Sequence, residues 1–149
     1  MPEEIVNDDP GNHCFGCSPH NEDGLQLRFV KTQSDVVETS YTAPSKFCGS
    51  EGVIHGGIQA AMLDEVLGVA AHACTDDEEL EIVTAEFRLN YRSPAPVGRP
   101  VVVRGRVVRT DGRDVYLEGE IIGEDGQTLT TAEARWRRIE RRPETSGAA

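Results

Sequence analysis

The feature that most constrains the fold is a long apolar segment in the middle of the chain. From Gly57 to Cys74, apolar residues would surround nearly the whole circumference of a helix, which would span roughly 27 Å. A helix that is apolar on all sides is usually buried. Because Asp64, Glu65 and His72 interrupt the run, it is not typical of a membrane span. The rest of the chain must therefore wrap this helix.

The remaining segments are typical of strands joined by tight turns. Alternating apolar residues over 25–30 predict one strand, and residues 36–42 predict a second. A polar turn over 75–79 would end the helix, and four further strands separated by Gly- and Pro-containing turns would follow it. Those four strands are predicted over Ile82–Arg92, Pro100–Arg109, Val115–Ile122 and Thr128–Arg138. For this order of elements, an antiparallel sheet curled around one helix is the economical arrangement.

Length and composition indicate one domain with an aliphatic core. The chain has 149 residues, of which 38% are hydrophobic and only 5% aromatic. Residues 1–12 are polar and are predicted to form a flexible arm, and residues 142–149 a disordered tail, so the domain would cover 13–141. The expected fold class is α+β, with a curved antiparallel sheet of about six strands around one long central helix.

Charge and the N-terminal sequence exclude some classes of function. The formal net charge of −11 has the wrong sign for a protein that binds nucleic acid. The first ten residues are acidic and polar, so we predict no secretory signal, no membrane partner and a cytoplasmic location. The four cysteines would then be mostly reduced.

Two glycines at the predicted helix start suggest a binding site for a carbonyl group. The first N–H groups of a helix lack internal partners and carry the positive end of the helix dipole. Gly56 and Gly57 would let a ligand approach these groups closely, which suits a carbonyl oxygen that becomes an oxyanion. Asp64 lies farther along the same apolar run. Because burying an unpartnered carboxylate is costly, Asp64 is either a satisfied structural residue or a catalytic acid.

The spacing of these residues favours a site shared between two chains. Asp64 follows Gly57 by seven residues, so the two share a helix face but lie about 10 Å apart along the axis. This distance is too long for both to act on one carbonyl carbon. If two helices pack antiparallel across a two-fold axis, Gly57 of one chain can approach Asp64 of the other. Sheets joined at their edges would also favour a homodimer.

At this point the sequence resembles a known family. The motif H-G-G at 55–57, followed by an acidic residue nine positions after the His, resembles the hot-dog thioesterases, in the branch related to the phenylacetic-acid-pathway enzymes. C-F-G-C at 14–17 and N-x-x-G-L at 21–25 are similar to the opening of one sub-branch. Residues 84–94 are similar to the strand that follows its central helix. The resemblance covers nearly the whole predicted domain and implies a hot-dog fold.

The resemblance also implies roles for individual residues. Asp64 matches the nucleophile or general base of the family, and Gly57 matches the backbone donor to the thioester carbonyl. His55 matches the His that shapes this turn. Thr84 matches a position where a hydroxyl helps to place the attacking water.

Further residues are expected to contact the substrate. Many relatives carry Asn or Gln six residues before the His, where this chain has Gly49 with Ser50 beside it. Glu65 lies about 100° around the helix from Asp64 and is the second candidate acid. Four strand arginines could bind coenzyme A phosphates, because Arg matches phosphate geometry; they are Arg88, Arg92, Arg104 and Arg106. The expected substrate-binding residues are Gly56, Glu65, Ser50, Asn21 and Arg92.

These observations predict the hydrolysis of acyl-CoA or related acyl thioesters to a free acid and a thiol. No metal or organic cofactor is expected. The expected partners are the acyl-CoA substrate and a second copy of the chain, with dimers pairing further into tetramers. One alternative is a non-catalytic acyl-CoA-binding or regulatory protein of the same fold. Another is a hot-dog hydratase with His as its base, which His55 before Gly-Gly suits less well.

The cysteine pair at the N-terminus leaves another alternative open. Cys14-x-x-Cys17, with His13 and His20 nearby, could bind zinc. Structural zinc usually needs four ligands, and a second C-x-x-C is missing. We therefore predict no metal site and expect this turn to pack over the substrate entrance, as the resemblance implies.

Overall fold

The computed structural model describes residues 2–73 and 80–141, which form one long helix and a single curved sheet. The helix α1 (Gly56–Ala73) is preceded by a short 3-10 helix, η1 (Ser45–Phe47). The described residues contain seven strands: β1 (Glu3–Ile5), β2 (Phe29–Gln33), β3 (Val36–Thr42), β4 (Leu80–Tyr91), β5 (Pro100–Asp111), β6 (Asp114–Ile122) and β7 (Thr128–Glu140). The predicted architecture of an antiparallel sheet around one central helix is confirmed.

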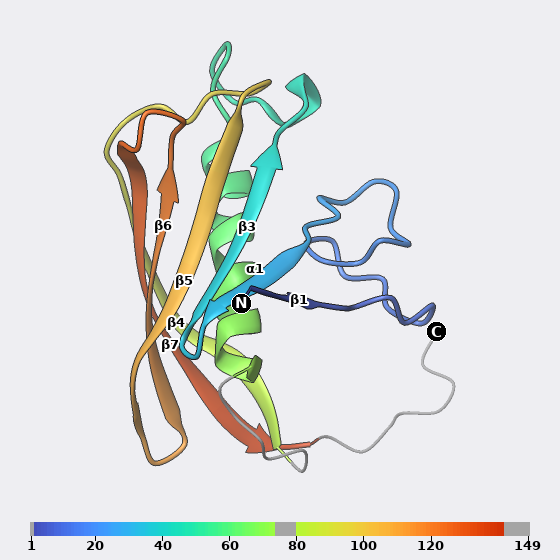
Figure 1. The fold of residues 1–149 in the computed structure, drawn as a ribbon, viewed down its shortest axis with the longest axis vertical. Coiled ribbons are helices and arrows are strands. Elements are labelled where there is room, and N and C mark those ends of the chain that lie inside the picture. The colour runs from blue at the N-terminus through green and yellow to red at the C-terminus, as the bar shows by residue number, and fades with distance from the viewer. Residues whose placement is uncertain (1, 74–79, 142–149) are drawn as a thin grey trace.

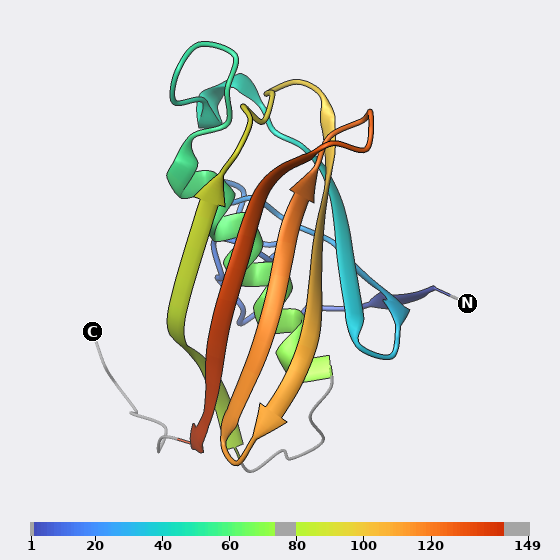
Figure 2. The same ribbon diagram turned by 90° about the vertical axis from the view of Figure 1, so that its left-hand side faces the viewer.

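The strands pair in the order β1-β2-β3-β5-β6-β7-β4, and every pair is antiparallel. The sheet curves along α1, as Figures 1 and 2 show from two directions. β4 directly follows the helix in the described chain and lies at one end of the strand order. A strand of 12 residues therefore presents its outer edge beside the helix.

The extreme N-terminus differs from the prediction. The sequence predicts a flexible arm over 1–12, but Glu3–Ile5 pairs with β2 and adds a seventh strand to the sheet. Glu3 lies opposite Lys31, and opposite charges on facing positions stabilise such a pair modestly.

The strand predicted over 25–30 begins only at Phe29. Gln26 has a left-handed φ of 53°, which interrupts the extended backbone that a strand requires. Leu25 and Leu27 are buried, as their alternation predicts, but their amides donate to carbonyl groups of the turn at 14–17 instead of to a strand.

The other predicted elements lie within a few residues of their predicted bounds. The predicted polar turn over 75–79, the last predicted helical residue Cys74 and the predicted tail over 142–149 lie outside the described residues.

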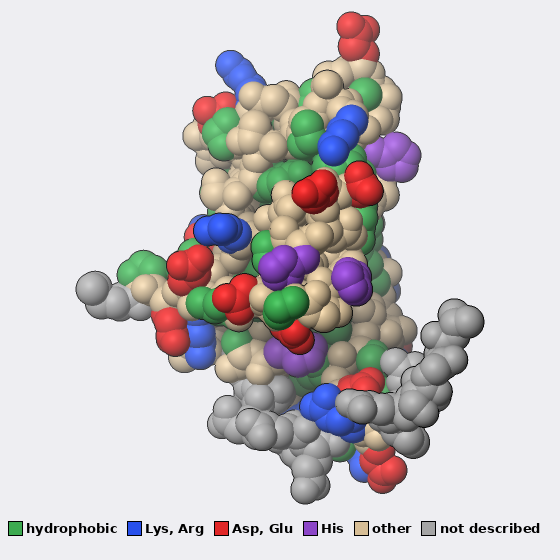
Figure 3. All heavy atoms as spheres, turned by 90° about the vertical axis from the view of Figure 1, so that its right-hand side faces the viewer, with side chains coloured by type: hydrophobic (Ala, Val, Ile, Leu, Met, Phe, Trp, Pro, Cys, Tyr) green, Lys and Arg blue, Asp and Glu red, His purple; other side chains and the backbone are tan. Residues whose placement is uncertain are grey.

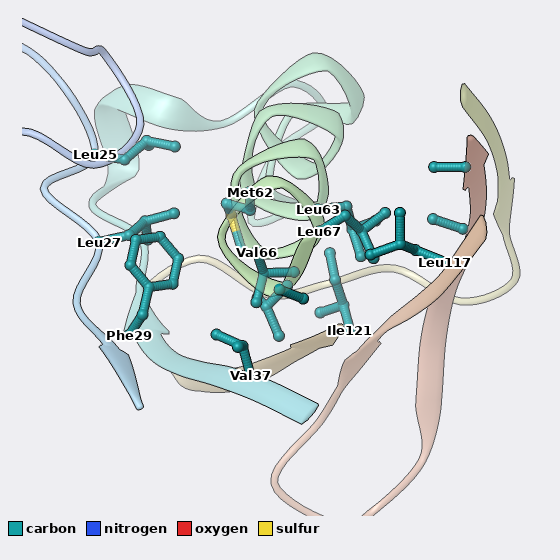
Figure 4. Close-up of a cluster of buried hydrophobic side chains, with 14 of the residues drawn as sticks. Leu25, Leu27, Phe29, Val37, Met62, Leu63, Val66, Leu67, Leu117 and Ile121 are labelled. Carbon is teal, nitrogen blue, oxygen red and sulfur yellow. The ribbon is translucent and has the colours of Figure 1, made fainter. Parts of the chain in front are cut away.

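The central helix is packed on two sides. Leu63 and Leu67 point toward Leu117 and Ile121 of the sheet (Figure 4). On another side, Met62 points toward the N-terminal segment, whose Leu25, Leu27 and Phe29 are nearly fully buried. The helix is apolar around its circumference because the sheet and this segment enclose it between them.

Two glycines let the helix lie close to the sheet. Gly105 of β5 and Gly119 of β6 face each other across the ladder. A Cβ atom at Gly105 would lie 3.2 Å from the carbonyl oxygen of Val66, and one at Gly119 would lie 3.2 Å from Cδ2 of Leu63. These distances are shorter than ordinary van der Waals contact. The absence of a side chain at Gly105 therefore lets the helix backbone approach β5, and its absence at Gly119 makes room for the side chains of Leu63 and Leu67.

No helix among the described residues has the length and apolar character needed to cross a bilayer.

Candidate active site

Asp64 projects from the middle of α1 and is half-buried. The Thr84 hydroxyl donates a hydrogen bond of 2.9 Å to Oδ1 of Asp64. Thr84 lies on β4 where the register against β7 shifts between Thr84 and Glu86. Burial raises the pKa of Asp64 above its ordinary value, and the Thr84 hydrogen bond partly offsets this. No ion pair among the described residues involves Asp64, so its carboxylate keeps a strengthened basicity.

His55 closes the first turn of the helix. The Gly57 amide donates a 2.9 Å hydrogen bond to Nδ1 of His55, and the Gln59 amide donates a 3.0 Å bond to the His55 carbonyl oxygen. These bonds satisfy two of the amides that a helix start leaves unpaired. Gly57 and His55 are both exposed. The Gly57 amide therefore lies at the surface, but it already donates its hydrogen bond to His55 of the same chain.

Three residues that sequence reasoning missed hold this turn in place. The Tyr91 hydroxyl donates a 2.8 Å hydrogen bond to the Gly56 carbonyl oxygen. Buried Gln59 donates through Nε2 to the Ile54 carbonyl oxygen at 2.9 Å and accepts a 2.6 Å bond from the Thr130 hydroxyl. The polar residue Gln59 within an apolar helical run could have indicated this network, because a buried side-chain amide needs hydrogen-bond partners. Nothing in the local sequence marks Tyr91 or Thr130.

A cavity of about 480 Å³ opens beside the helix start. It brings together Ser50, His55, Gly56 and Arg92, all of which the sequence assigned to the site, and Tyr91 also lines it. Asp64 and Thr84 are not among its lining residues.

The strand arginines separate into two groups. Arg88, Arg104 and Arg106 each pair with a glutamate, at N···O distances of 3.6, 2.7 and 2.8 Å. Arg92 forms no ion pair within the described part of the chain. Of the four arginines considered for phosphate binding, Arg92 is therefore the one that combines an uncommitted charge with a place at the helix-start cavity.

Two predicted substrate-binding residues lie elsewhere. Glu65 faces the N-terminal segment, where its Oε1 accepts a hydrogen bond from Sγ of Cys14 at 3.3 Å. The Asn21 side chain donates to the His13 carbonyl oxygen at 3.3 Å within the same segment. No side-chain hydrogen bond or ion pair among the described residues joins either of them to Asp64.

One chain thus presents two separate half-sites. The helix start carries the exposed Gly57 amide and the cavity with Arg92, whereas Asp64 and Thr84 lie two helical turns farther along. Seven residues of helix correspond to about 10 Å, so the two halves of one chain do not converge on a single atom.

Cys17 is a poor candidate for a nucleophile. Burial, a hydrogen bond with Cys14 and the nearby charge of Glu65 raise the pKa of Cys17 to about 12, so without a bound cation its thiol stays protonated near neutral pH. Cys48 is exposed, in the loop before α1.

Figure 3 shows the face opposite the sheet, where acidic and histidine side chains gather near the middle.

Comparison with known proteins identifies relatives of this fold and sequence. The thioesterase superfamily profile matches residues 51–130. The acyl-coenzyme A thioesterase THEM4 of Bos taurus is 32% identical over 111 residues, which are 72% of this chain and 44% of that protein. The chain thus spans less than half the length of that relative.

Two solved structures extend the comparison. A thioesterase superfamily protein superposes with a TM-score of 0.77 and 27% identity, over 84% of this chain and 60% of that chain. A phenylacetic acid degradation-related protein of Ralstonia eutropha JMP134 superposes with a TM-score of 0.68 and 26% identity, over 76% of this chain and 85% of that chain. The hot-dog architecture and the resemblance to phenylacetic-acid-pathway proteins are confirmed.

Proposed function

The chain belongs to the thioesterase superfamily, and from this premise we propose that it hydrolyses acyl-CoA thioesters to a free acid and coenzyme A. The observation that carries the proposal is Asp64, a half-buried carboxylate without an ion pair among the described residues, hydrogen-bonded to a hydroxyl on the edge strand. The printed activity of the Bos taurus relative, an acyl-coenzyme A thioesterase, supports the same substrate class.

The proposed chemistry needs one carboxylate and one hydrogen-bond donor. Asp64 takes a proton from water while the water oxygen adds to the thioester carbonyl carbon, and the Thr84 hydroxyl helps to place that water. A helix-start amide, that of Gly57, stabilises the developing oxyanion. The carbon–sulfur bond then breaks, and the thiolate leaves and takes up a proton. Attack by the carboxylate itself, followed by hydrolysis of the anhydride, uses the same residues.

We propose that the site is assembled from two chains. β4 ends the strand order, and Thr84 to Glu86 are exposed in the single chain. Pairing two β4 edges across a two-fold axis would cover a long strand edge that soluble proteins rarely leave open. The same symmetry would bring the two α1 helices together antiparallel, so that Gly57 of one chain meets Asp64 of the other. Dimers would pair further into tetramers.

The coenzyme A portion would bind at the helix-start cavity. Arg92 supplies an uncommitted guanidinium at its wall, and Ser50 and His55 supply polar groups. A guanidinium matches the geometry of a phosphate group. For the Gly57 amide to donate to the substrate, its hydrogen bond to Nδ1 of His55 must be shared or broken. His55 would thus keep the donor oriented until the carbonyl oxygen arrives.

Thr84→Val tests the pairing of hydroxyl and carboxylate. The Thr84 hydrogen bond lowers the pKa of Asp64 against the effect of burial, so its removal should raise that pKa further. Since catalysis needs the ionised carboxylate, the acid limb of kcat/KM against pH should move to higher pH. Thr110→Val, at an exposed position on β5, should leave the limb in place. An unmoved limb in Thr84→Val would show that the hydroxyl does not act on the catalytic acid.

A panel of acyl-CoA esters tests the function itself. Acetyl, medium-chain, long-chain and aromatic esters are incubated with the purified chain, and free thiol is measured with a chromogenic disulfide. We expect enzyme-dependent thiol release from at least one ester. Thermal stabilisation by the esters without thiol release from any of them would instead identify a non-catalytic acyl-CoA-binding protein.

A further inference from the structure

Three potential metal ligands converge where the N-terminal segment meets the central helix. Cys14 and Cys17 belong to one turn, and Glu65 projects from α1. Their ligand atoms, two sulfurs and one carboxylate oxygen, all lie within 4.8 Å of one another. We propose that Cys14, Cys17 and Glu65 bind a borderline-soft divalent cation, zinc above all, as two thiolates and one carboxylate.

The distances fit tetrahedral coordination. With Zn–S bonds of about 2.3 Å and Zn–O bonds of about 2.0 Å, the sulfur–oxygen edge of a tetrahedron is about 3.5 Å. Sγ of Cys14 lies 3.3 Å from Oε1 of Glu65. This pair of donors is thus close to its spacing around an ion, and the other two pairs of ligand atoms lie within 4.8 Å. Hydrogen bonds join Cys14 both to Glu65 and to Cys17, and they hold the three ligand atoms within reach of one ion.

The turn is built to admit the carboxylate. Phe15 and Gly16 separate the two cysteines. The Ser18 amide donates a 3.1 Å hydrogen bond to the Cys14 carbonyl oxygen and closes the turn. A Cβ atom at Gly16 would lie 2.1 Å from Cγ of Glu65. Any larger residue at this position would therefore expel the glutamate from the cysteine pair.

Amide groups surround one of the sulfurs. Nδ2 of Asn7 lies 3.0 Å from Sγ of Cys17, and Nδ2 of Asn12 lies 3.8 Å from the same atom. Donors to a metal-bound thiolate orient it and stabilise its negative charge. The Cys14 amide also donates to Oδ1 of Asn12 at 3.0 Å, so the same asparagine holds both cysteines.

The fourth coordination position would face a cavity. Cys17 and Glu65 both line a hollow of about 780 Å³ between the N-terminal segment and α1, which has room for a water ligand. The histidines considered from the sequence lie apart from the triad: Nε2 of His20 approaches the Asp8 carbonyl oxygen at 2.9 Å, and His13 is not a member of the cluster. The third ligand comes from the helix instead.

A bound ion would tie the N-terminal segment to the residue adjacent to Asp64. This segment covers one side of α1 with Leu25, Leu27 and Phe29. The cation would therefore act as a structural cross-link over the helix. Binding of the cation is measured without any assay of hydrolysis, so the test of this cation site is independent of the test of the proposed function.

The test uses the full chain, purified under reducing conditions and stripped with a chelator. One sample of the stripped chain is reloaded with excess zinc and dialysed before its zinc content is measured. Another sample of the stripped chain receives Co²⁺ as a spectroscopic probe. We expect one equivalent of zinc per chain and a thiolate-to-cobalt charge-transfer band in the near ultraviolet. At a hundredfold excess over Kd, zinc should raise the thermal midpoint by roughly 5–10 °C.

Variants separate the triad from adventitious binding. Cys17→Ser should abolish the charge-transfer band and the zinc-dependent rise in thermal midpoint, and Glu65→Gln should weaken zinc binding at least tenfold. Gly16→Ala retains every donor atom but displaces Glu65, so it should weaken binding comparably. Cys48→Ser removes an exposed cysteine outside the cluster and should bind zinc as the unmodified chain does.

Several results would overturn the proposal. They are less than a stoichiometric amount of zinc in the reduced chain, equal binding by the unmodified chain and Cys17→Ser, and loss of binding in Cys48→Ser. A mass showing that Cys14 and Cys17 form a disulfide even under reductant and zinc would also overturn it.

Discussion

Asp64→Asn is expected to lower kcat/KM for thioester hydrolysis by roughly 10³-fold, as for the loss of a general base or nucleophile. Asparagine has nearly the same shape and can still accept the Thr84 hydrogen bond, but it cannot accept a proton at neutral pH. The variant should therefore bind substrate with little change and fail at the chemical step. Acyl-CoA turnover and substrate-induced thermal shifts, measured on the same samples, separate the two effects.

The same substitution should stabilise the protein near neutral pH. Burial raises the pKa of Asp64 in the folded state, so the folded chain binds this proton more readily than the unfolded chain. Stability from this group is then present at low pH and declines as the pH rises from about 3.8 through the raised value. A neutral side chain removes that decline.

The control for Asp64→Asn is Glu124→Gln, an equal change of charge in the turn between β6 and β7. It should keep full activity. If Asp64→Asn hydrolysed the best substrate at an unchanged rate, Asp64 would be a structural residue and the proposed mechanism would fail.

Mixing two inactive variants is expected to restore activity. Gly57→Pro removes the amide donor at a position in the first helical turn, where proline is tolerated. Alone, Gly57→Pro and Asp64→Asn should both be nearly inactive. In a mixed dimer, the Asp64→Asn chain supplies an intact Gly57 and the other chain supplies an intact Asp64, so one of the two sites is complete.

Random reassortment gives a defined yield. Half of the dimers would be mixed and each would carry one working site, so about a quarter of the unmodified activity should return. The variants are mixed, partly denatured and refolded, and mass measurements of the intact assembly give the fraction of mixed dimers. No recovery despite mixed dimers would place both halves of the site in one chain. Circular dichroism of Gly57→Pro alone provides the folding control.

Much of the fold could be predicted because its main determinant is local. A mostly apolar run that begins at two glycines predicted the start of α1 to within a residue, and the strands after it follow clear turn sequences. β1 was missed because three residues carry no readable alternation, and its pairing with β2 is long-range. The strand over 25–30 was wrong because a single left-handed residue, Gln26, changes the backbone without changing the apolar pattern.

The candidate site was predictable where the residues are close in sequence. His55, Gly56 and Gly57 do lie at the helix start. Thr84 was assigned to the site only from the resemblance, and its hydrogen bond to Asp64, 20 residues away in sequence, was not predicted. Glu65 could not be placed, because its contact with the turn at 14–17 depends on how the N-terminal segment crosses the helix. The roles of these residues, the assembly of two chains and the cytoplasmic location stay predictions.

The facing pair Gly105 and Gly119 has a consequence for how this protein can evolve. Adding a methyl group at Gly105 would crowd the Val66 carbonyl group in the backbone of α1. Adding one at Gly119 would crowd the Arg104 carbonyl oxygen and the side-chain ends of Leu63 and Leu67. Mutational scans should therefore find these two positions, remote from Asp64, less tolerant of larger residues than the surrounding loops.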